Sequence, residues 1–303
     1  MPPSRPRRRT EPVPRPRPAA AGLRLLVEVA AHHRSQEGPA MTVRFTTSPD
    51  GTGIAFEQLG DGPPVVVTGG ALSTRYEGLP LARELAGLGL SGVVYDRRGR
   101  GGSGDTPPYA PAREDEDLAA VLGAVGGGAA CAFGVSSGAL IALGAAARTG
   151  AAPGRLVLFE PPFTGAVGHP QDPAHAARLA DFLDRKRRAD AVAYFLGEII
   201  GLPPESVAGV RRSPAWGGLT RIAHTLRYDT TLLGDATLPA GILTAVRVPV
   251  LVLSSDASTR LLQDAARAVA EALPCGEHRT VPGAFHQAPA EALAPVVRDF
   301  LAA

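Results

Sequence analysis

Cysteine is scarce in this sequence, and the scarcity excludes two kinds of site. The chain has 303 residues but only two cysteines, Cys131 and Cys275. Two cysteines cannot build the disulfide framework of a small secreted domain. Cys131 lies in the apolar run AACAFGV, which favours a small buried side chain. The sequence has no CxxC or HxxxH pair with the spacing of metal ligands, so we expect neither a disulfide nor a metal site.

Long apolar runs and a strong net charge are also missing. No uninterrupted run reaches the roughly 18 apolar residues that a membrane-spanning helix needs. The formal net charge is only +2, and much of the basic excess lies in residues 4–18, SRPRRRTEPVPRPRP. The rest of the chain is neutral to acidic. The composition therefore gives no support for nucleic acid or a membrane as a partner of the folded part.

The first 40 residues lack the composition of a folded core. They are rich in Pro and Arg. Their one apolar run is interrupted by Arg24 and Glu28, which argues against an export signal. Met41 opens a stretch that is typical of the start of a domain. We predict that residues 1–40 are a disordered extension or a mis-called start, that the folded domain spans 41–303, and that the protein is cytoplasmic.

Short apolar runs alternate with helical patterns along the rest of the chain. Residues 42–46 and 53–58 flank a Pro-Asp-Gly turn, which predicts a hairpin. The later runs are continuous and four to seven residues long, as in parallel strands buried on both faces; they are PVVV, SGVVYD, AACAFGV, RLVLFE and VPVLVLSS. The alternation predicts an α/β fold, with a doubly wound and mostly parallel sheet.

One long interval has no strand pattern. Between RLVLFE, which ends at residue 160, and VPVLVLSS, which begins at residue 248, the sequence predicts several helices. An interval of this length is too long for a simple loop. We therefore predict a helical cap over about residues 165–246, inserted after the sixth strand.

The chemistry-bearing motif is Gly134-Val135-Ser136-Ser137-Gly138, which fits G-x-S-x-G. It follows a predicted strand and precedes a predicted helix, and this is the context in which the motif places a nucleophilic serine. The flanking glycines leave room for a strained turn that exposes the hydroxyl. Only Ser136 has glycine at both −2 and +2, so it is the candidate nucleophile, and the Ser137 amide is a candidate oxyanion donor.

Four ordered signals carry a resemblance to the α/β-hydrolase superfamily over about residues 42–303. They are the Gly-Gly turn after VVVT, the turn DRRGRGGS, the elbow GVSSG and the sequence PGAFH before the last helix. The resemblance implies that His286 is the catalytic base, since it follows the last strand. It also implies a second oxyanion donor at the Gly70 amide, with Thr68 in place of the usual histidine.

Two carboxylates compete for the acid of the triad. The family most often places an aspartate after LVLSS, where this chain has Ser258, with Asp256 two residues earlier. A minority of the family places the acid at the end of the preceding strand, where Glu160 stands. A charged residue that ends an apolar strand has no obvious structural reason to be there. We favour Glu160 over Asp256.

The glycine-rich turn Asp96–Gly104 could instead bind a nucleotide. It follows a strand, but Pro107, Pro108 and Pro111 come after it rather than a helix that opens on a phosphate. We interpret the turn as structural.

The sequence thus predicts a serine hydrolase that cleaves an ester-like bond of a small molecule and needs no cofactor. Thioester cleavage, peroxyacid formation and carbon–carbon bond hydrolysis remain open on the same triad, as does a ligand-binding homologue without turnover. The substrate and the oligomeric state stay open too. Five aromatic residues suggest an aromatic-lined acyl site, or else simply the core of the cap: Phe163, Tyr194, Phe195, Trp216 and Tyr228.

Overall fold

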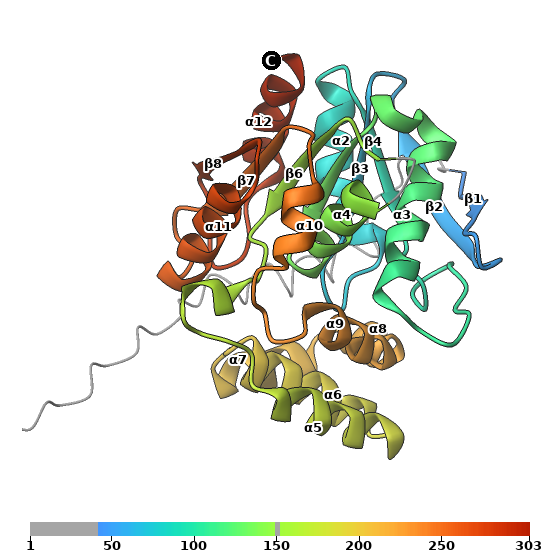
Figure 1. Ribbon diagram of the computed structural model, residues 1–303. Helices are drawn as coiled ribbons and strands as arrows, with labels where there is room; N and C mark the ends of the chain where they lie inside the picture. Colours follow the sequence, from blue (N-terminus) through green and yellow to red (C-terminus); the bar gives the residue numbers. More distant parts are fainter. Residues whose placement is uncertain (1–41, 149–151) are drawn as a thin grey trace, which may run out of the picture.

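Eight strands form one sheet in the computed structural model, which describes residues 42–148 and 152–303 (Figure 1). The predictions for residues 1–40 lie outside the described residues. The strand order is β1-β2-β4-β3-β5-β6-β7-β8. The strands are β1 (Arg44–Thr47), β2 (Gly53–Leu59), β3 (Pro64–Thr68), β4 (Ser91–Tyr95), β5 (Cys131–Val135), β6 (Arg155–Phe159), β7 (Val250–Ser255) and β8 (Gly276–Val281).

The sheet is mostly parallel, as predicted. β2 pairs antiparallel with β1 and with β4, and every other pair is parallel. β4 and β7 are buried along their whole length, which explains their continuous apolar sequences. Because parallel strands end at the same edge, the residues that follow β3, β5, β6 and β7 are brought together there.

Helices cover both faces of the sheet. One apolar core joins the sheet to α3 (Pro111–Val125), α4 (Ser137–Arg148), α10 (Ala240–Ala245) and α11 (Arg260–Ala272). The core on the opposite face joins it to α2 (Leu79–Gly87) and α12 (Ala290–Ala302). This two-sided cover is the doubly wound architecture that the sequence predicts.

Between β6 and β7 the described residues form helices and connecting turns, with no strand. Figure 1 shows α5 to α9 as a separate layer beyond one edge of the sheet, whereas α10 lies against α4. We refer to α5–α9, Pro173–Leu233, as the cap. Its elements are α5 (Pro173–Asp184), α6 (Arg188–Tyr194), a π-helical turn (Phe195–Ile199), α7 (Pro204–Arg212), α8 (Trp216–Arg221), a 3₁₀ turn (Ala223–Thr225) and α9 (Leu226–Leu233).

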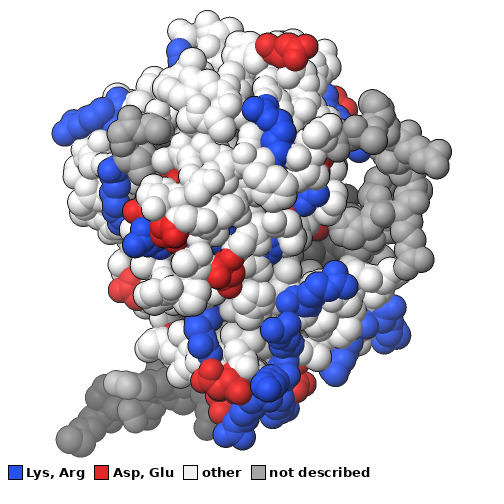
Figure 2. All heavy atoms as spheres, turned by 90° about the vertical axis from the view of Figure 1, so that its right-hand side faces the viewer, with Lys and Arg blue, Asp and Glu red and all other residues white. Residues whose placement is uncertain are grey.

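The cap has an apolar core of its own. Buried side chains of α5, α6, α7 and α9 form one cluster, which also includes Leu72 from the loop after β3. The outer surface of the cap is charged, and Figure 2 shows basic side chains gathered over the lower part of the molecule with acidic ones beside them. Several are paired, such as Arg185 with Asp181 at 2.8 Å and Arg227 with Asp184 at 2.6 Å.

Candidate active site

Ser136 occupies a strained turn between β5 and α4. Its φ is +54°, a left-handed conformation that costs a non-glycine residue about 1–3 kcal/mol. Close packing explains the glycines on either side. A Cβ on Gly134 would lie 2.5 Å from Gly138 O, and a Cβ on Gly138 would lie 2.3 Å from Thr68 O. The local sequence thus permits a turn that larger residues would disrupt.

Glu160 and His286 meet at the same edge of the sheet. Glu160 directly follows β6 and is fully buried. Its Oε2 lies 2.6 Å from His286 Nδ1, and its Oε1 accepts a hydrogen bond of 2.9 Å from the Ser255 amide. The Ser136 amide donates to Phe159 O at 3.0 Å, so the serine turn adjoins the residue before Glu160. Glu160 and His286 also have positive φ, at +45° and +54°. Strained backbone at three such residues is characteristic of functional sites.

Asp256 lies apart from the imidazole. It is exposed, and its Oδ1 accepts a hydrogen bond of 3.0 Å from the Gly283 amide. Ser258 occupies the place where relatives often have the acid, and its Oγ accepts a bond of 3.4 Å from the His286 amide. Both side chains therefore support the loop that carries His286, while Glu160 is the carboxylate that contacts its ring.

The candidate oxyanion donors lie next to the serine. A Cβ on Gly70 would lie 3.1 Å from Ser136 Cβ and 3.7 Å from Oγ, so only glycine allows this approach without a shift. Ser137 is the first residue of α4, where a backbone amide has no acceptor within the helix. Thr68 is fully buried at the end of β3.

Two other described histidines have side-chain partners elsewhere. His175 Nδ1 lies 2.9 Å from the Tyr194 hydroxyl, and His278 Nε2 lies 2.9 Å from Ser254 Oγ. Burial holds the pKa of His224 below its usual value. Within the described ranges, no group of three His, Cys, Asp or Glu side chains could hold a metal ion.

Comparison with known proteins places the chain in a family. The sequence model of the alpha/beta hydrolase family matches residues 61–297, most of the chain. The chain belongs to that family.

Solved structures agree. An alpha/beta hydrolase from Sphaerobacter thermophilus is 44% identical, with 85% of this chain and 99% of that chain covered and a TM-score of 0.77. A hydrolase from Pseudomonas aeruginosa (23% identity, 88% and 100% covered, TM-score 0.67) and a thermophilic esterase from Thermogutta terrifontis (22%, 87% and 98%, 0.64) share the fold. No match was found among the curated proteins.

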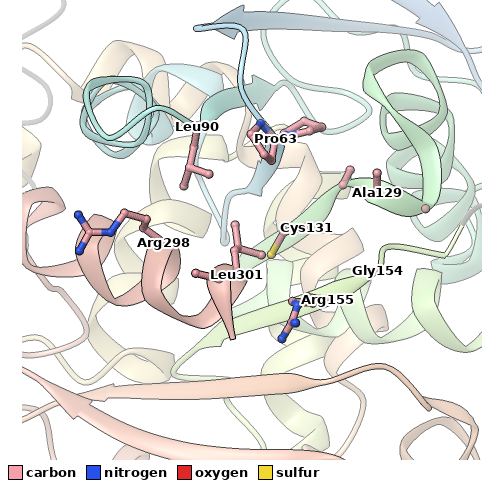
Figure 3. A pocket seen from close by; sticks show the side chains of 12 residues that line it. Pro63, Leu90, Ala129, Cys131, Gly154, Arg155, Arg298 and Leu301 are labelled. Atoms are coloured by element: carbon pink, nitrogen blue, oxygen red, sulfur yellow. The ribbon is translucent and has the colours of Figure 1, made fainter.

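A pocket of this hydrolase lies away from the candidate site (Figure 3). Its volume is about 400 Å³, and its lining includes Pro64, Cys131 and Arg155, the first residues of β3, β5 and β6. It is therefore at the amino ends of the strands, whereas Ser136 and Glu160 follow the carboxyl ends. Burial raises the pKa of the Cys131 thiol to about 12, which leaves it protonated and unreactive. Ligands of open α/β sheets bind at the carboxyl ends, so we do not assign the reaction to this pocket.

The five aromatic residues have different surroundings. Phe195 is buried in the cap core, and Tyr194 and Trp216 pack against that core. Phe163 is buried in the core of the sheet, and Tyr228 stacks on Tyr109 with ring centroids 4.0 Å apart. All but Phe163 therefore lie in the cap, and Tyr228 differs from the other three because it stacks on Tyr109 from the turn before α3. None of the helices in the described part of the chain is long and apolar enough to cross a bilayer.

Sequence reasoning missed the charged residues that contact the loop after β3. We refer to this loop, Gly69–Ser73, as the candidate oxyanion loop, because it contains the candidate donor Gly70. Arg97 and Arg100, from the turn after β4, are nearly fully buried and bind Asp229 of α9. The sequence does signal the arginines, because a short turn that holds three arginines directly after a buried strand needs acidic partners. It does not signal which acid binds them.

Proposed function

We propose that the protein is a serine hydrolase that cleaves an ester-like acyl bond of a small molecule. The observation that carries the proposal is the 2.6 Å contact between His286 Nδ1 and the buried Glu160 carboxylate, at the sheet edge where Ser136 sits in a strained turn. A buried carboxylate bonded to a histidine is the arrangement that orients a catalytic base.

In the first half of the reaction, the Glu160 carboxylate accepts a hydrogen bond from the Nδ1–H group of His286, and this tautomer has its lone pair on Nε2. This nitrogen takes the proton of the Ser136 hydroxyl as Oγ bonds to the substrate carbonyl carbon. The carbonyl oxygen takes up the negative charge, and the amides of Gly70 and Ser137 donate to it. When the intermediate collapses, the bond to the alcohol breaks and His286 protonates the leaving oxygen.

In the second half, water replaces the alcohol. His286 Nε2 removes a proton from water as its oxygen bonds to the acyl carbon, and the same two amides hold the oxyanion. The bond to Ser136 Oγ then breaks, the serine recovers its proton from His286, and the acid leaves. No cofactor takes part in either half.

The apolar side chains where the cap meets the candidate site favour an apolar substrate. Ala71 and Leu72 follow the proposed donor Gly70, and Phe285 precedes His286. All three pack with the apolar cluster of the cap. Groups on a bound carbonyl compound would therefore meet hydrocarbon surface next to the reacting atoms.

Thioesters are the second candidate class, because the same acyl-enzyme chemistry serves both. Structures that share this fold include esterases and a thioesterase domain. The contact of His286 with the buried Glu160 carboxylate favours an enzyme over a ligand-binding homologue without turnover, since a binding protein has no need to orient an imidazole.

A fluorophosphonate probe tests the proposal. We expect the wild-type protein to be labelled at Ser136, as mapped by mass spectrometry of the modified peptide, and the Ser136→Ala variant not to be labelled. A panel of p-nitrophenyl esters and matched thioesters then separates the two substrate classes. A folded wild-type protein that takes no label and hydrolyses neither class would overturn the proposal.

A further inference from the structure

A buried cluster of charges lies beneath the candidate oxyanion loop. The turn after β4 buries four charged side chains to 2% exposure or less, namely Asp96, Arg97, Arg98 and Arg100. Arg97 binds Glu114 of α3 through two hydrogen bonds of 2.6 and 2.7 Å. Charged side chains of the turn are therefore already paired with other side chains of the protein. This pairing agrees with a structural rather than a nucleotide-binding role.

One partner in this cluster comes from the cap. Asp229 of α9 is 4% exposed, and its carboxylate accepts bonds from Arg97 Nη1 at 2.9 Å, Arg100 Nη2 at 2.8 Å and Ser137 Oγ at 2.8 Å. Burial acts to raise the pKa of Asp229, but Arg100 and Arg97 outweigh it and hold that pKa below its usual value. With Glu114, the four side chains sum to zero charge, as buried charges require.

The two arginines bind the oxyanion loop on their other side. Arg100 Nη1 donates to Gly70 O at 2.6 Å, and Arg97 Nη1 lies 3.3 Å from Gly69 O. Gly69 O and the Gly70 N–H belong to one planar peptide and point in opposite directions. Arg97, which contacts the Gly69 oxygen, therefore helps to fix where the Gly70 N–H points and polarises that amide into a better donor. Arg100 holds the adjoining Gly70–Ala71 peptide through Gly70 O.

The same carboxylate also contacts the residue with the other donor. The Ser137 side chain donates to Asp229, while its backbone amide stands at the start of α4. Asp229 thus accepts a hydrogen bond from Ser137 directly, and it is connected to the carbonyls of Gly69 and Gly70 through the two arginines. Without its charge, two neighbouring guanidinium groups would repel each other in a buried site and move, and the loop they hold would move with them.

We propose that Asp229 is a positioning residue of the oxyanion hole, which acts on the Gly70 amide through Arg97 and Arg100 and on Ser137 directly. The inference rests on the proposed function. It also links the cap to the reaction, because the oxyanion hole is fully held only when α9 is packed in place.

The test compares two buried aspartates that each bind arginine from the same turn. Asp229→Asn removes the charge under the oxyanion loop. The control, Asp117→Asn, removes the charge that binds Arg98 at 2.7 Å, away from that loop. For both variants we would measure kcat and KM on a p-nitrophenyl ester, Tm, and the inhibition constant of a trifluoromethyl ketone, whose adduct with Ser136 carries an oxyanion.

For Asp229→Asn we expect kcat to fall about 10- to 100-fold, less than or similar to the loss of a whole oxyanion donor, with KM changed less than about twofold. The inhibition constant of the ketone should rise by the same factor as kcat falls. Asp117→Asn should lower Tm and leave both quantities close to wild type. A folded Asp229→Asn variant with wild-type kcat and ketone affinity overturns the proposal.

Arg100→Lys keeps the test decisive if Asp229→Asn does not fold. Lysine preserves the charge but cannot donate to Gly70 O and Asp229 with the geometry of two guanidinium nitrogens. Arg100 Nε has no partner among the described residues, so the only other bond that the substitution removes there is the 3.2 Å bond of Nη1 to Ser73 O in the same loop. We expect the same paired change in kcat and ketone affinity, and wild-type values for both would overturn the proposal. Failure of the proposed function is distinguishable, because it would appear as a wild-type protein that neither labels at Ser136 nor turns over ester.

Discussion

The edge of the sheet and the cap that adjoins it are built in different ways. At the sheet edge, each candidate catalytic residue directly follows a strand or its loop, and three of them adopt positive φ. In the cap, short helices pack around apolar side chains, and the α6 helix gives way to a π-helical turn. The ends of the strands hold individual candidate catalytic residues in place, whereas the cap presents an apolar surface. Substitutions at the edge should therefore change kcat, and substitutions in the cap should mainly change which substrate is accepted.

Asp229 is the exception that joins the two regions. The cap's outer ion pairs, such as Arg227 with Asp184, involve side chains that are 47% and 69% exposed. Pairs of this kind contribute about 0–1 kcal/mol. Asp229, by contrast, is buried against the turn after β4. We therefore expect most of the cap surface to tolerate substitution and Asp229 not to tolerate it.

The largest expected effect separates the two candidate acids. Glu160→Gln should lower kcat about 10⁴-fold, because a neutral amide no longer fixes the tautomer of His286 or stabilises its imidazolium. Asp256→Asn is the matched control and should cost less than about tenfold, since among the described residues the Asp256 carboxylate accepts a hydrogen bond from the Gly283 backbone amide and has no contact with the His286 ring. Steady-state kinetics on one ester decide between them. The reverse order would transfer the role to Asp256.

A smaller effect is expected at the oxyanion loop. Gly70→Ala would place a Cβ 3.1 Å from Ser136 Cβ and 3.2 Å from Val135 O, so the loop must shift by a few tenths of an ångström. We expect kcat to fall about 10- to 100-fold, because a donor displaced from the oxyanion stabilises it less. The control is Gly123→Ala in α3, where a Cβ meets nothing within 4 Å. It should raise Tm slightly and leave kcat unchanged. Equal kcat values for Gly70→Ala and Gly123→Ala would indicate that the Gly70 amide takes no part in the reaction.

The cap prediction concerns substrate range. Trp216 packs on the apolar cluster of the cap, which includes Leu72. Phe285 packs on the same cluster. Trp216→Ala should lower kcat/KM about tenfold for a hexanoate ester, through the loss of apolar contact, and change it little for acetate. Trp216→Phe should keep most of the preference for the longer chain. An equal loss for both esters would indicate that the tryptophan supports the fold and not the substrate.

The sequence predicts the sheet better than the cap, for physical reasons. Strands buried on both faces must be apolar throughout, so each of β3 to β7 stands out as a short apolar run. Helix α11 is not among the elements that the sequence analysis predicts, although its face of Ala265, Ala266, Val269 and Ala270 is buried and its other face is strongly polar. The stretch 215–233 is helical as predicted but is broken by the 3₁₀ turn Ala223–Thr225. That break is set by packing and not by a local signal.

The residues of the candidate site also differ in whether the sequence alone can reveal them. Ser136 and Glu160 can be found locally, one from its glycines and one as a charge that ends an apolar strand. Asp229 cannot, because it resembles any helical aspartate and its arginine partners are about 130 positions away. Contacts of such sequence separation depend on the fold, so one sequence without its structure does not reveal them.

The smallest expected effect compares Asp229 with another buried carboxylate. Asp115 of α3 is 1% exposed, but its partner Arg148 is about half exposed, and one of its oxygens has no partner among the described residues. Burial raises the pKa of Asp115 to about 6, from 3.8 for an exposed aspartate. The folded state therefore binds this proton more tightly than the unfolded chain. The resulting stabilisation is present below about pH 4 and is lost as the pH rises to about 6.

Asp115→Asn removes that titration. Its Tm relative to wild type should rise as the pH goes from 4 to 7, because wild type must then bury a poorly paired charge and the variant need not. Asp184→Asn, an exposed control, should show a small and nearly constant difference in Tm. A Tm difference for Asp115→Asn that is the same at both pH values would contradict the prediction. The contrast with Asp229 would then fail as well, because a carboxylate with one half-exposed arginine would be as well compensated as one held by two buried ones.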